Sequence, residues 1–357
     1  MRFKMKMAYN EDINLFKYKS DRNWYLALGL VLLLLPMIMG DYYISQFTFV
    51  FITSILTVGL MLLTGFTGQL SLGHVGFFAI GSYTSAVLTG KGVPFLLALP
   101  ASGLLAAFIG IFVGIPALRL TGMYLAIMTM GFAFIIEQIL ARWESVTRGR
   151  MGLVLAPPSI GPLKFDNEIS YYYLALVCLM FSILLVRNIL RSPTGRAMIA
   201  IRDSEVAAQA IGVSLLKFKT IAFALSAFFA GIAGSLNAHK LSFITPENFG
   251  FFQSVGYLAM IIIGGIGTLH GAVLGTAFLL FLPGIIIILK DFLPHAIAGQ
   301  TGLEPLIMGL IIVLFIIFEP LGIYGVWIKI RIYFESFPFY KKDTFKRVQG
   351  YTKAERH

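Results

Sequence analysis

Polar side chains inside long apolar runs are the groups of this chain best placed to do chemistry. The densest set consists of Thr64, Thr67, Gln69, Ser71 and His74, with glycines between them. Inside a membrane such a side chain costs free energy unless it faces protein or water. A glycine-rich break in a helix is tolerated there only where it is buried or lines a cavity. The set predicts either a discontinuous helix beside a solute path or a tight turn between two helices.

Two other places offer polar groups in apolar surroundings. Thr268 and His270 follow Gly264 in a second glycine-rich stretch, which could line the same path or form a re-entrant turn. Glu137 is the one carboxylate plainly within an apolar run. It could attract a substrate ammonium, although a structural ion pair with Arg142 is favoured. The candidate path residues are therefore Gln69, Ser71, His74, Glu137, Gly264 and Thr268.

The sequence carries none of the common motifs of catalysis or cofactor binding. Gly90-Lys91-Gly92 lacks the Ser or Thr and the upstream glycine of a phosphate-binding P-loop. No Gly-x-Ser-x-Gly elbow is present, and the five histidines include no pair at the helical spacing of metal ligands. We therefore expect a chain that is not an enzyme and that holds no cofactor or metal of its own.

The elements that must carry these residues are membrane helices. The chain has 357 residues, of which 58% are hydrophobic and only 13% charged, and its mean hydropathy is +0.84. A soluble protein cannot bury that much apolar surface, and the 36 glycines suit helices that pack closely in a bilayer. The single cysteine, Cys178, excludes a disulfide within the chain. The expected fold class is all-α, a polytopic integral membrane protein.

The basic residues are grouped in a way that indicates orientation. Of 28 Lys and Arg, six lie in residues 1–23, six in residues 187–219 and eight from residue 329 onward. Basic blocks between apolar spans follow the positive-inside rule, so both termini and the central block are expected in the cytoplasm. This placement argues against nucleic-acid binding as the meaning of the net charge of +11.

About ten spans fit the apolar runs, because a bilayer core needs roughly 20 helical residues. Six precede the central polar block and four follow it, and the second to fifth and seventh to tenth could form an inverted repeat. The domain plan is a basic cytoplasmic segment (1–23), a permease domain (24–328) with a loop at 191–216, and a basic cytoplasmic tail (329–357). The expected spans are residues 24–40, 47–65, 70–89, 95–118, 121–141, 171–189, 218–238, two spans within 251–289 divided by the glycines at 264–267, and 305–318.

The central polar block, residues 192–213, reads as two short helices. Ser192 before Pro193 is an N-cap followed by a proline at the first helical position. Ser204 can cap a second helix with Glu205 in its first turn, and Gly212 can end that helix in a left-handed turn. The second helix has a face of small side chains, which suits docking into a groove on another protein. An ordinary amphipathic loop between membrane helices has the same pattern.

Four separated motifs, in order, carry a resemblance to a known family. They are Thr67-Gly68-Gln69-Leu70-Ser71-Leu72-Gly73-His74, Leu118-Arg119-Leu120-Thr121-Gly122-Met123-Tyr124, the Gly195-Arg196 to Gly212-Val213 block, and Ile263-Gly264-Gly265-Ile266-Gly267-Thr268-Leu269-His270-Gly271. From about residue 59 to about residue 325, the chain resembles ABC importer permeases of the branched-chain amino acid (LivM) type.

The resemblance implies that the central block is a coupling loop that inserts into an ATPase subunit. Arg119 could touch the same subunit. The implied assembly contains two ABC ATPases that bind ATP, a second homologous permease and an extracytoplasmic substrate-binding protein, in a bacterial plasma (inner) membrane. Charging the packed face of the loop, as in Ala208→Glu, would uncouple ATP hydrolysis from uptake. The implied coupling residues are Gly195, Arg196, Arg202, Asp203, Glu205, Ala207, Ala208 and Gly212.

Other functions remain open on the same scaffold. Branched-chain amino acids are the first expectation for the substrate. Related permeases move urea, short amides or sugars, so these substrates stay open as alternatives. A transporter of another class, an ion-coupled secondary transporter, would need intramembrane carboxylate or histidine pairs, and Glu137 is the only candidate.

Overall fold

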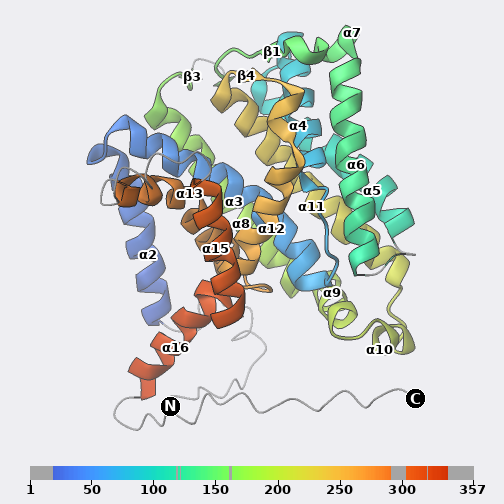
Figure 1. Ribbon diagram of the computed structural model, residues 1–357, viewed down its shortest axis with the longest axis vertical. Coiled ribbons are helices and arrows are strands. Elements are labelled where there is room, and N and C mark those ends of the chain that lie inside the picture. The colour runs from blue at the N-terminus through green and yellow to red at the C-terminus, as the bar shows by residue number, and fades with distance from the viewer. Residues whose placement is uncertain are drawn as a thin grey trace.

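Helices make up most of the described part of this computed structural model, which covers residues 19–117, 120, 122–160, 163–290, 303–319 and 321–336. The expectations for Arg119, for most of the basic N-terminal segment and for the tail beyond residue 336 lie outside the described residues. The described α-helices, shown in Figure 1, are α2 (Lys19–Leu34), α3 (Asp41–Thr67), α4 (His74–Gly90), α5 (Phe95–Ala117), α6 (Met123–Arg142), α7 (Glu144–Thr147), α8 (Glu168–Arg191), α9 (Pro193–Asp203), α10 (Glu205–Ala210), α11 (Leu215–Leu241), α12 (Phe251–Gly264), α13 (Leu269–Lys290), α15 (Leu303–Phe318) and α16 (Gly322–Ser336).

Short 3-10 turns and strands complete the described elements. The strands β1 and β4 pair antiparallel with each other, as do β2 and β3. The 3-10 turns are η1 (Leu35–Met37), η2 (Gly149–Met151) and η3 (Pro246–Phe249), and the strands are β1 (Leu153–Val154), β2 (Ser159–Ile160), β3 (Leu163–Lys164) and β4 (Phe243–Ile244).

The two longest helices, α3 and α11, form the centre of the bundle. Helix α11 packs against α3, α4 and α5, and α3 also packs against α8 and α13. Both helices are apolar around most of their circumference, which is typical of helices surrounded by other helices. Glycine permits the closest approach: a Cβ at Gly234 of α11 would lie 2.0 Å from the carbonyl oxygen of Phe78 in α4. The small residues of these helices therefore set how tightly the core closes.

Six helices among the described residues are long and apolar enough to cross a bilayer, namely α3, α5, α6, α8, α11 and α13. The apolar helices α2 and α15 are shorter, as are α4 and α12. The division of the 251–289 run at its glycines is confirmed, since α12 ends at Gly264 and α13 begins at Leu269. The total of about ten spans stays a prediction.

The helix contacts repeat between the two halves of the chain. When α3, α4, α5 and α6 are matched in order with α11, α12, α13 and α15, the contacts α4–α5, α5–α11 and α4–α6 have counterparts in α12–α13, α13–α3 and α12–α15. This correspondence is the packing that an inverted repeat would produce.

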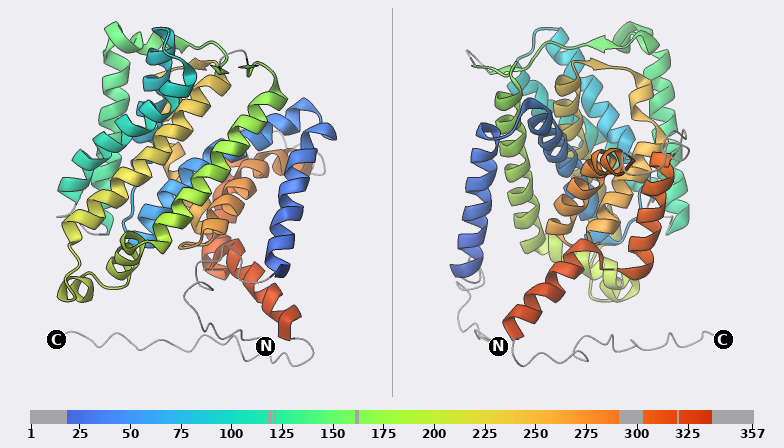
Figure 2. Two further views of the ribbon diagram at one scale, coloured as in Figure 1. Left: turned by 180° about the vertical axis from the view of Figure 1, so that it is seen from behind. Right: turned by 60° about the vertical axis from the view of Figure 1, so that its left-hand side comes forward.

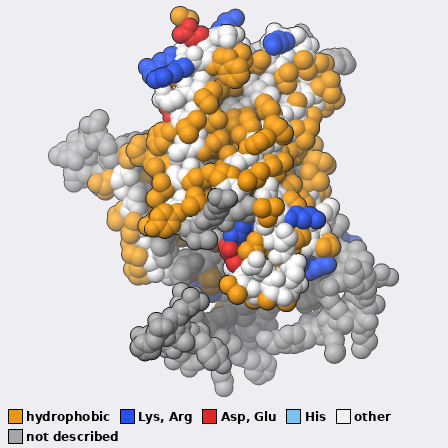
Figure 3. Space-filling model, turned by 90° about the vertical axis from the view of Figure 1, so that its right-hand side faces the viewer, with side chains coloured by type: hydrophobic (Ala, Val, Ile, Leu, Met, Phe, Trp, Pro, Cys, Tyr) orange, Lys and Arg blue, Asp and Glu red, His pale blue; other side chains and the backbone are white. Residues whose placement is uncertain are grey.

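The surface divides into an apolar middle and charged ends. In Figure 3 hydrophobic side chains cover the middle of the visible face, while basic and acidic side chains gather above and below it. Helices α9 and α10 lie at one end together with the start of α2 and the end of α16, and α7, β1 and β4 lie at the other (Figures 1 and 2). Helix α16 runs through residue 329, where the basic tail is expected to begin.

Candidate functional site

Two capped helices form the loop between α8 and α11. The hydroxyl of Ser192 accepts a hydrogen bond from the Gly195 N–H at 3.4 Å, and the hydroxyl of Ser204 accepts one from the Ala207 N–H at 3.2 Å. Gly212 follows α10 with a φ of +85°, in the left-handed region that favours glycine. The predicted caps and the predicted left-handed turn are confirmed.

The exposed face of α10 differs from the face that sequence reasoning selected. Ala208 is only 2% exposed and lies on the inner side of α10, so Ala208→Glu would disturb the protein's own packing. Val206 and Ile211 are 79% and 75% exposed, although they are apolar and lie at a charged end of the molecule. These two side chains are the large apolar groups exposed on α10 and at its C-cap.

Arg202 points back into the protein. Its Nη1 donates a hydrogen bond to the carbonyl oxygen of Gly65 at 3.1 Å, and its Nη2 forms an ion pair with Asp203 at 3.1 Å. Gly65 lies in the last turn of α3, where carbonyl groups lack partners within the helix. The Arg202 guanidinium therefore caps a core helix.

An ion pair between a buried lysine and a partly exposed glutamate fixes the start of α10 to α11. The Lys219 ammonium lies 2.7 Å from Oε1 of Glu205, and the Lys219 side chain is 3% exposed. A buried lysine needs such a partner because desolvating its charge is costly. In the sequence, Lys219 was identified only as one of the six basic residues in 187–219 that indicate a cytoplasmic position. No local pattern links it to Glu205, fourteen positions earlier.

The first glycine-rich stretch is a break between helices. Helix α3 ends at Thr67 and α4 begins at His74, and in Figure 1 the trace between them rises beside α11 before α4 starts. Along this segment Gln69 and Ser71 are buried whereas Leu70 is exposed, the alternation of an extended chain. An extended break, rather than a tight turn, therefore connects α3 to α4.

Hydrogen bonds tie this break to neighbouring helices. His74 Nδ1 is 2.9 Å from the Ser71 hydroxyl, and His74 Nε2 is 2.5 Å from the hydroxyl of Ser226 in α11. The Leu72 N–H donates to the hydroxyl of Thr129 in α6 at 3.0 Å. Both ring nitrogens of His74 are thus used within the protein, which favours a structural role for this histidine.

Gln69 differs from the other polar residues of the break. It is 4% exposed, and its side-chain oxygen and nitrogen have no hydrogen-bond partner in the part of the chain that the structure describes. A buried amide without partners costs free energy and calls for an explanation. Of the candidate path residues, Gln69 has the clearest unused capacity to bind a solute or water.

The polar groups of the second glycine-rich stretch are used within the protein. The Thr268 hydroxyl donates to the Gly265 carbonyl at 3.0 Å and accepts from the Gly271 N–H at 3.1 Å, so it caps the start of α13. Gly264 is pressed against the backbone of Gly271, where a Cβ would have no room. His270 is hydrogen bonded to the Tyr25 hydroxyl at 2.5 Å and stacks on Tyr324.

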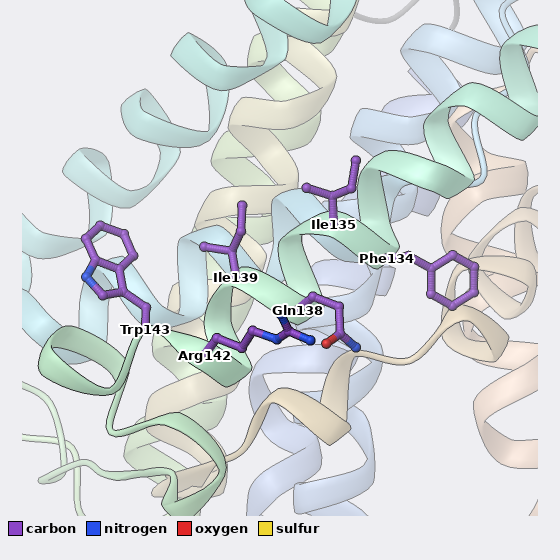
Figure 4. Close-up of a pocket in the computed structure, with 6 residues that line it drawn as sticks. All are labelled: Phe134, Ile135, Gln138, Ile139, Arg142 and Trp143. Carbon is purple, nitrogen blue, oxygen red and sulfur yellow. The ribbon is translucent and has the colours of Figure 1, made fainter.

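Glu137 lies on α6, apart from these contacts. It is partly exposed, and among the described residues it forms no ion pair with Arg142, so the favoured interpretation is wrong. A groove of about 550 Å³ lies on the neighbouring face of α6 (Figure 4). Phe134 at its edge stacks on Phe251 of α12. The lining residues are Phe134, Ile135, Gln138, Ile139, Arg142 and Trp143.

Comparisons with known proteins add a family to this geometry. Residues 42–316 match the family described as "Branched-chain amino acid transport system / permease component". The chain is 35% identical over 294 residues to the high-affinity branched-chain amino acid transport system permease protein LivM of Escherichia coli (strain K12), covering 75% of this chain and 68% of that protein.

More distant relatives have another substrate in their names. An autoinducer 2 import system permease protein LsrC of Escherichia coli O157:H7 is 26% identical over 284 residues, covering 73% of this chain and 78% of the relative.

A second LivM protein, that of Salmonella typhimurium, is 34% identical over 294 residues, covering 75% of this chain and 68% of that protein. No solved structure matches the chain.

Proposed function

Because the chain belongs to the permease family of branched-chain amino acid transport systems, we propose that it is the membrane subunit of an ABC importer for branched-chain or related aliphatic amino acids. Members of this family are transport subunits rather than enzymes. ATP would be bound and hydrolysed on partner subunits, and this chain would supply the path and respond to their movement.

The exposed apolar face of α10 is the observation that carries the coupling part of the proposal. Val206 and Ile211 project from a short helix that is held in place by the Ser204 cap and the Glu205–Lys219 ion pair. Apolar side chains exposed at the aqueous end of a membrane protein suit a protein interface, because a partner would remove them from water. We assign them to a groove on an ABC ATPase, with Arg196, Asp203, Ala207 and Gly212 near its rim.

The proposed assembly has two ATPases, a second homologous permease and an extracytoplasmic substrate-binding protein in a bacterial inner membrane. The common end of α2, α9, α10 and α16 supports a cytoplasmic position for both termini and for the loop. Closure of the ATPases would push α9 and α10, and the two permeases would rock to open the path alternately to either side.

Gln69 is the best-supported path residue of this chain. Its side-chain amide, which has no partner among the described residues, can donate to a carboxylate and accept from an ammonium, which suits an amino acid zwitterion. Ser71 and His74 would hold the segment that carries it, and Thr268 and Gly264 would shape the second break. Glu137 remains a candidate ammonium partner on α6.

The substrate class can be tested by reconstitution. The chain would be placed in proteoliposomes with its ATPases, second permease and binding protein, and uptake of radiolabelled leucine would be followed with and without ATP. We expect ATP-dependent uptake, with isoleucine and valine competing more effectively than urea or sugars. Uptake by this chain alone without ATP would instead support an ion-coupled transporter, and preferential uptake of autoinducer 2 would place the chain with its more distant relatives.

A further inference from the structure

Arg202 connects the loop to the end of a core helix. Its Nη1 lies 3.1 Å from the carbonyl oxygen of Gly65, near the end of α3, while Nε and Nη2 bond Oδ1 of Asp203 at 3.2 and 3.1 Å. The carboxylate holds one edge of the planar guanidinium, so the other edge is aimed at α3. The side chain is therefore oriented before any partner binds.

The same guanidinium lies against the second glycine-rich break. A Cβ at Gly267 would lie 3.1 Å from Arg202 Nη1, and a Cβ at Gly65 would lie 2.8 Å from the Gly267 nitrogen. The Gly267 N–H also donates to Sδ of Met61 in α3 at 3.2 Å. The two breaks, which are some 200 positions apart in the sequence, thus meet at Arg202.

The aliphatic part of Arg202 covers the start of the first break. Gly68 has a φ of +75°, and a Cβ there would lie 3.2 Å from Arg202 Cγ and 3.4 Å from its Cα. The stem therefore packs on the turn that leads to Gln69 while the head group caps α3. One side chain of α9 contacts both glycine-rich breaks.

We propose that Arg202 is a positioning residue that makes α9 and the two breaks move as one body. This inference rests on the proposed function and names the contact through which movement of the loop reaches the path beside Gln69. Arginine suits the role because its charge is permanent and its fork can hold Gly65 and Asp203 at once. Asp203 and the loop surface around it remain available to the ATPase.

Substitution in the complete transporter separates this role from a contact with the ATPase. Arg202→Gln is compared with Lys217→Gln, an exposed lysine at the start of α11 whose loss removes the same charge. We expect Arg202→Gln to assemble with both ATPases and to retain ATP hydrolysis, while the substrate moved per ATP falls about tenfold or more, a typical coupling effect. Arg202→Lys should restore part of the substrate moved per ATP hydrolysed. An ammonium can reach the Gly65 carbonyl but cannot hold Asp203 in the same geometry.

Two results would overturn the proposal. One is an Arg202→Gln transporter that moves as much substrate per ATP as Lys217→Gln. The other is loss of ATPase binding in Arg202→Gln, which would make Arg202 a partner contact. If the unmodified complex shows no ATP-dependent uptake at all, the proposed function fails instead, so the two failures are distinguishable.

Distances between spin labels test the same idea without altering Arg202. Labels at Arg196, an exposed residue of α9, and at Ile266 in the second break, in a Cys178→Ser background, should keep their separation when ATP binds. A label pair at Arg196 and Val154, at the opposite end, should change its separation. An Arg196–Ile266 distance that changes as much as the reference distance would contradict a rigid connection.

Discussion

At the residue scale, Ser192, Ser204 and Gly212 behave as their local sequence predicts. Helix caps and left-handed turns depend on a few neighbouring positions, so they can be read without tertiary contacts. The direction of Arg202 and Ala208 depends on Gly65 and on the rest of the bundle, which no local pattern reveals. Sequence reasoning therefore predicted the two caps and the left-handed turn, but it selected a buried alanine for the outer face of α10.

Val206 offers a sharper test of ATPase docking than Ala208. Because Val206 is 79% exposed, Val206→Asp should leave the permease folded and place an unpaired charge in the interface. An unpaired buried charge costs about 3 kcal/mol, which corresponds to a loss of affinity of about a hundredfold or more. Co-purification of the ATPase with the tagged permease measures the effect.

The matched control is Val154→Asp, since Val154 is equally exposed at the opposite end of the molecule. It should retain the ATPase. If the Val206 and Val154 variants retain the ATPase equally, Val206 lies outside the interface.

Gln69→Leu separates a path role from a structural one. Since the amide has no partner among the described residues, leucine of similar size should leave the melting temperature unchanged or raise it. We expect uptake to fall by about tenfold, because the path loses its polar contact. As a comparison, Ser226→Ala removes a hydrogen bond to His74 and should lower stability by about 1 kcal/mol. Full uptake in Gln69→Leu would assign Gln69 to packing alone.

At the element scale, glycine predicts where helices break, and neighbours decide what the break does. The glycines at 68–73 and 264–267 indicated both interruptions correctly. Whether the first was a turn or an extended segment depended on Thr129 and Ser226, which come from α6 and α11. Helix α16 was missed because its basic residues suggested a tail.

The Glu205–Lys219 pair should hold α10 in place as an element. Glu205→Gln leaves Lys219 buried without its partner, whereas Glu205→Gln combined with Lys219→Met removes both charges. Because the Glu205 side chain is 41% exposed, the single change should cost only about 1–2 kcal/mol. Hydrogen exchange of the α10 amides should accelerate in the single variant and recover in the double variant. If the α10 amides exchange as fast in the double variant as in the single one, the pair does not position α10.

At the scale of the whole molecule, charge grouping predicts the orientation of the chain. The basic blocks indicated a common side for the loop and the termini, and α9, α10, the start of α2 and the end of α16 do lie at one end. Composition alone could not separate the helices of the core from those at its edge. All are apolar, yet the share of residues buried in the most apolar 18-residue stretch of a candidate span ranges from 83% in α3 to 28% in α6.

Cysteine accessibility measures the orientation directly. In a Cys178→Ser background, Gln209→Cys should react with an impermeant thiol reagent only in inside-out vesicles. Val154→Cys should react only when the outer face is exposed to the reagent. The reverse pattern would invert the proposed topology and exclude docking of an ATPase on α10.

The central claim is that an ABC ATPase docks on the exposed face of α10, and site-specific cross-linking tests it most directly. A photoreactive amino acid would be placed at Ile211 in the complete transporter, and at Val154 as the control position. We predict that the Ile211 probe captures a P-loop ATPase and that the Val154 probe does not. Capture of the ATPase from Val154, or its absence from Ile211 in a complex that still carries out ATP-driven uptake, would contradict the account.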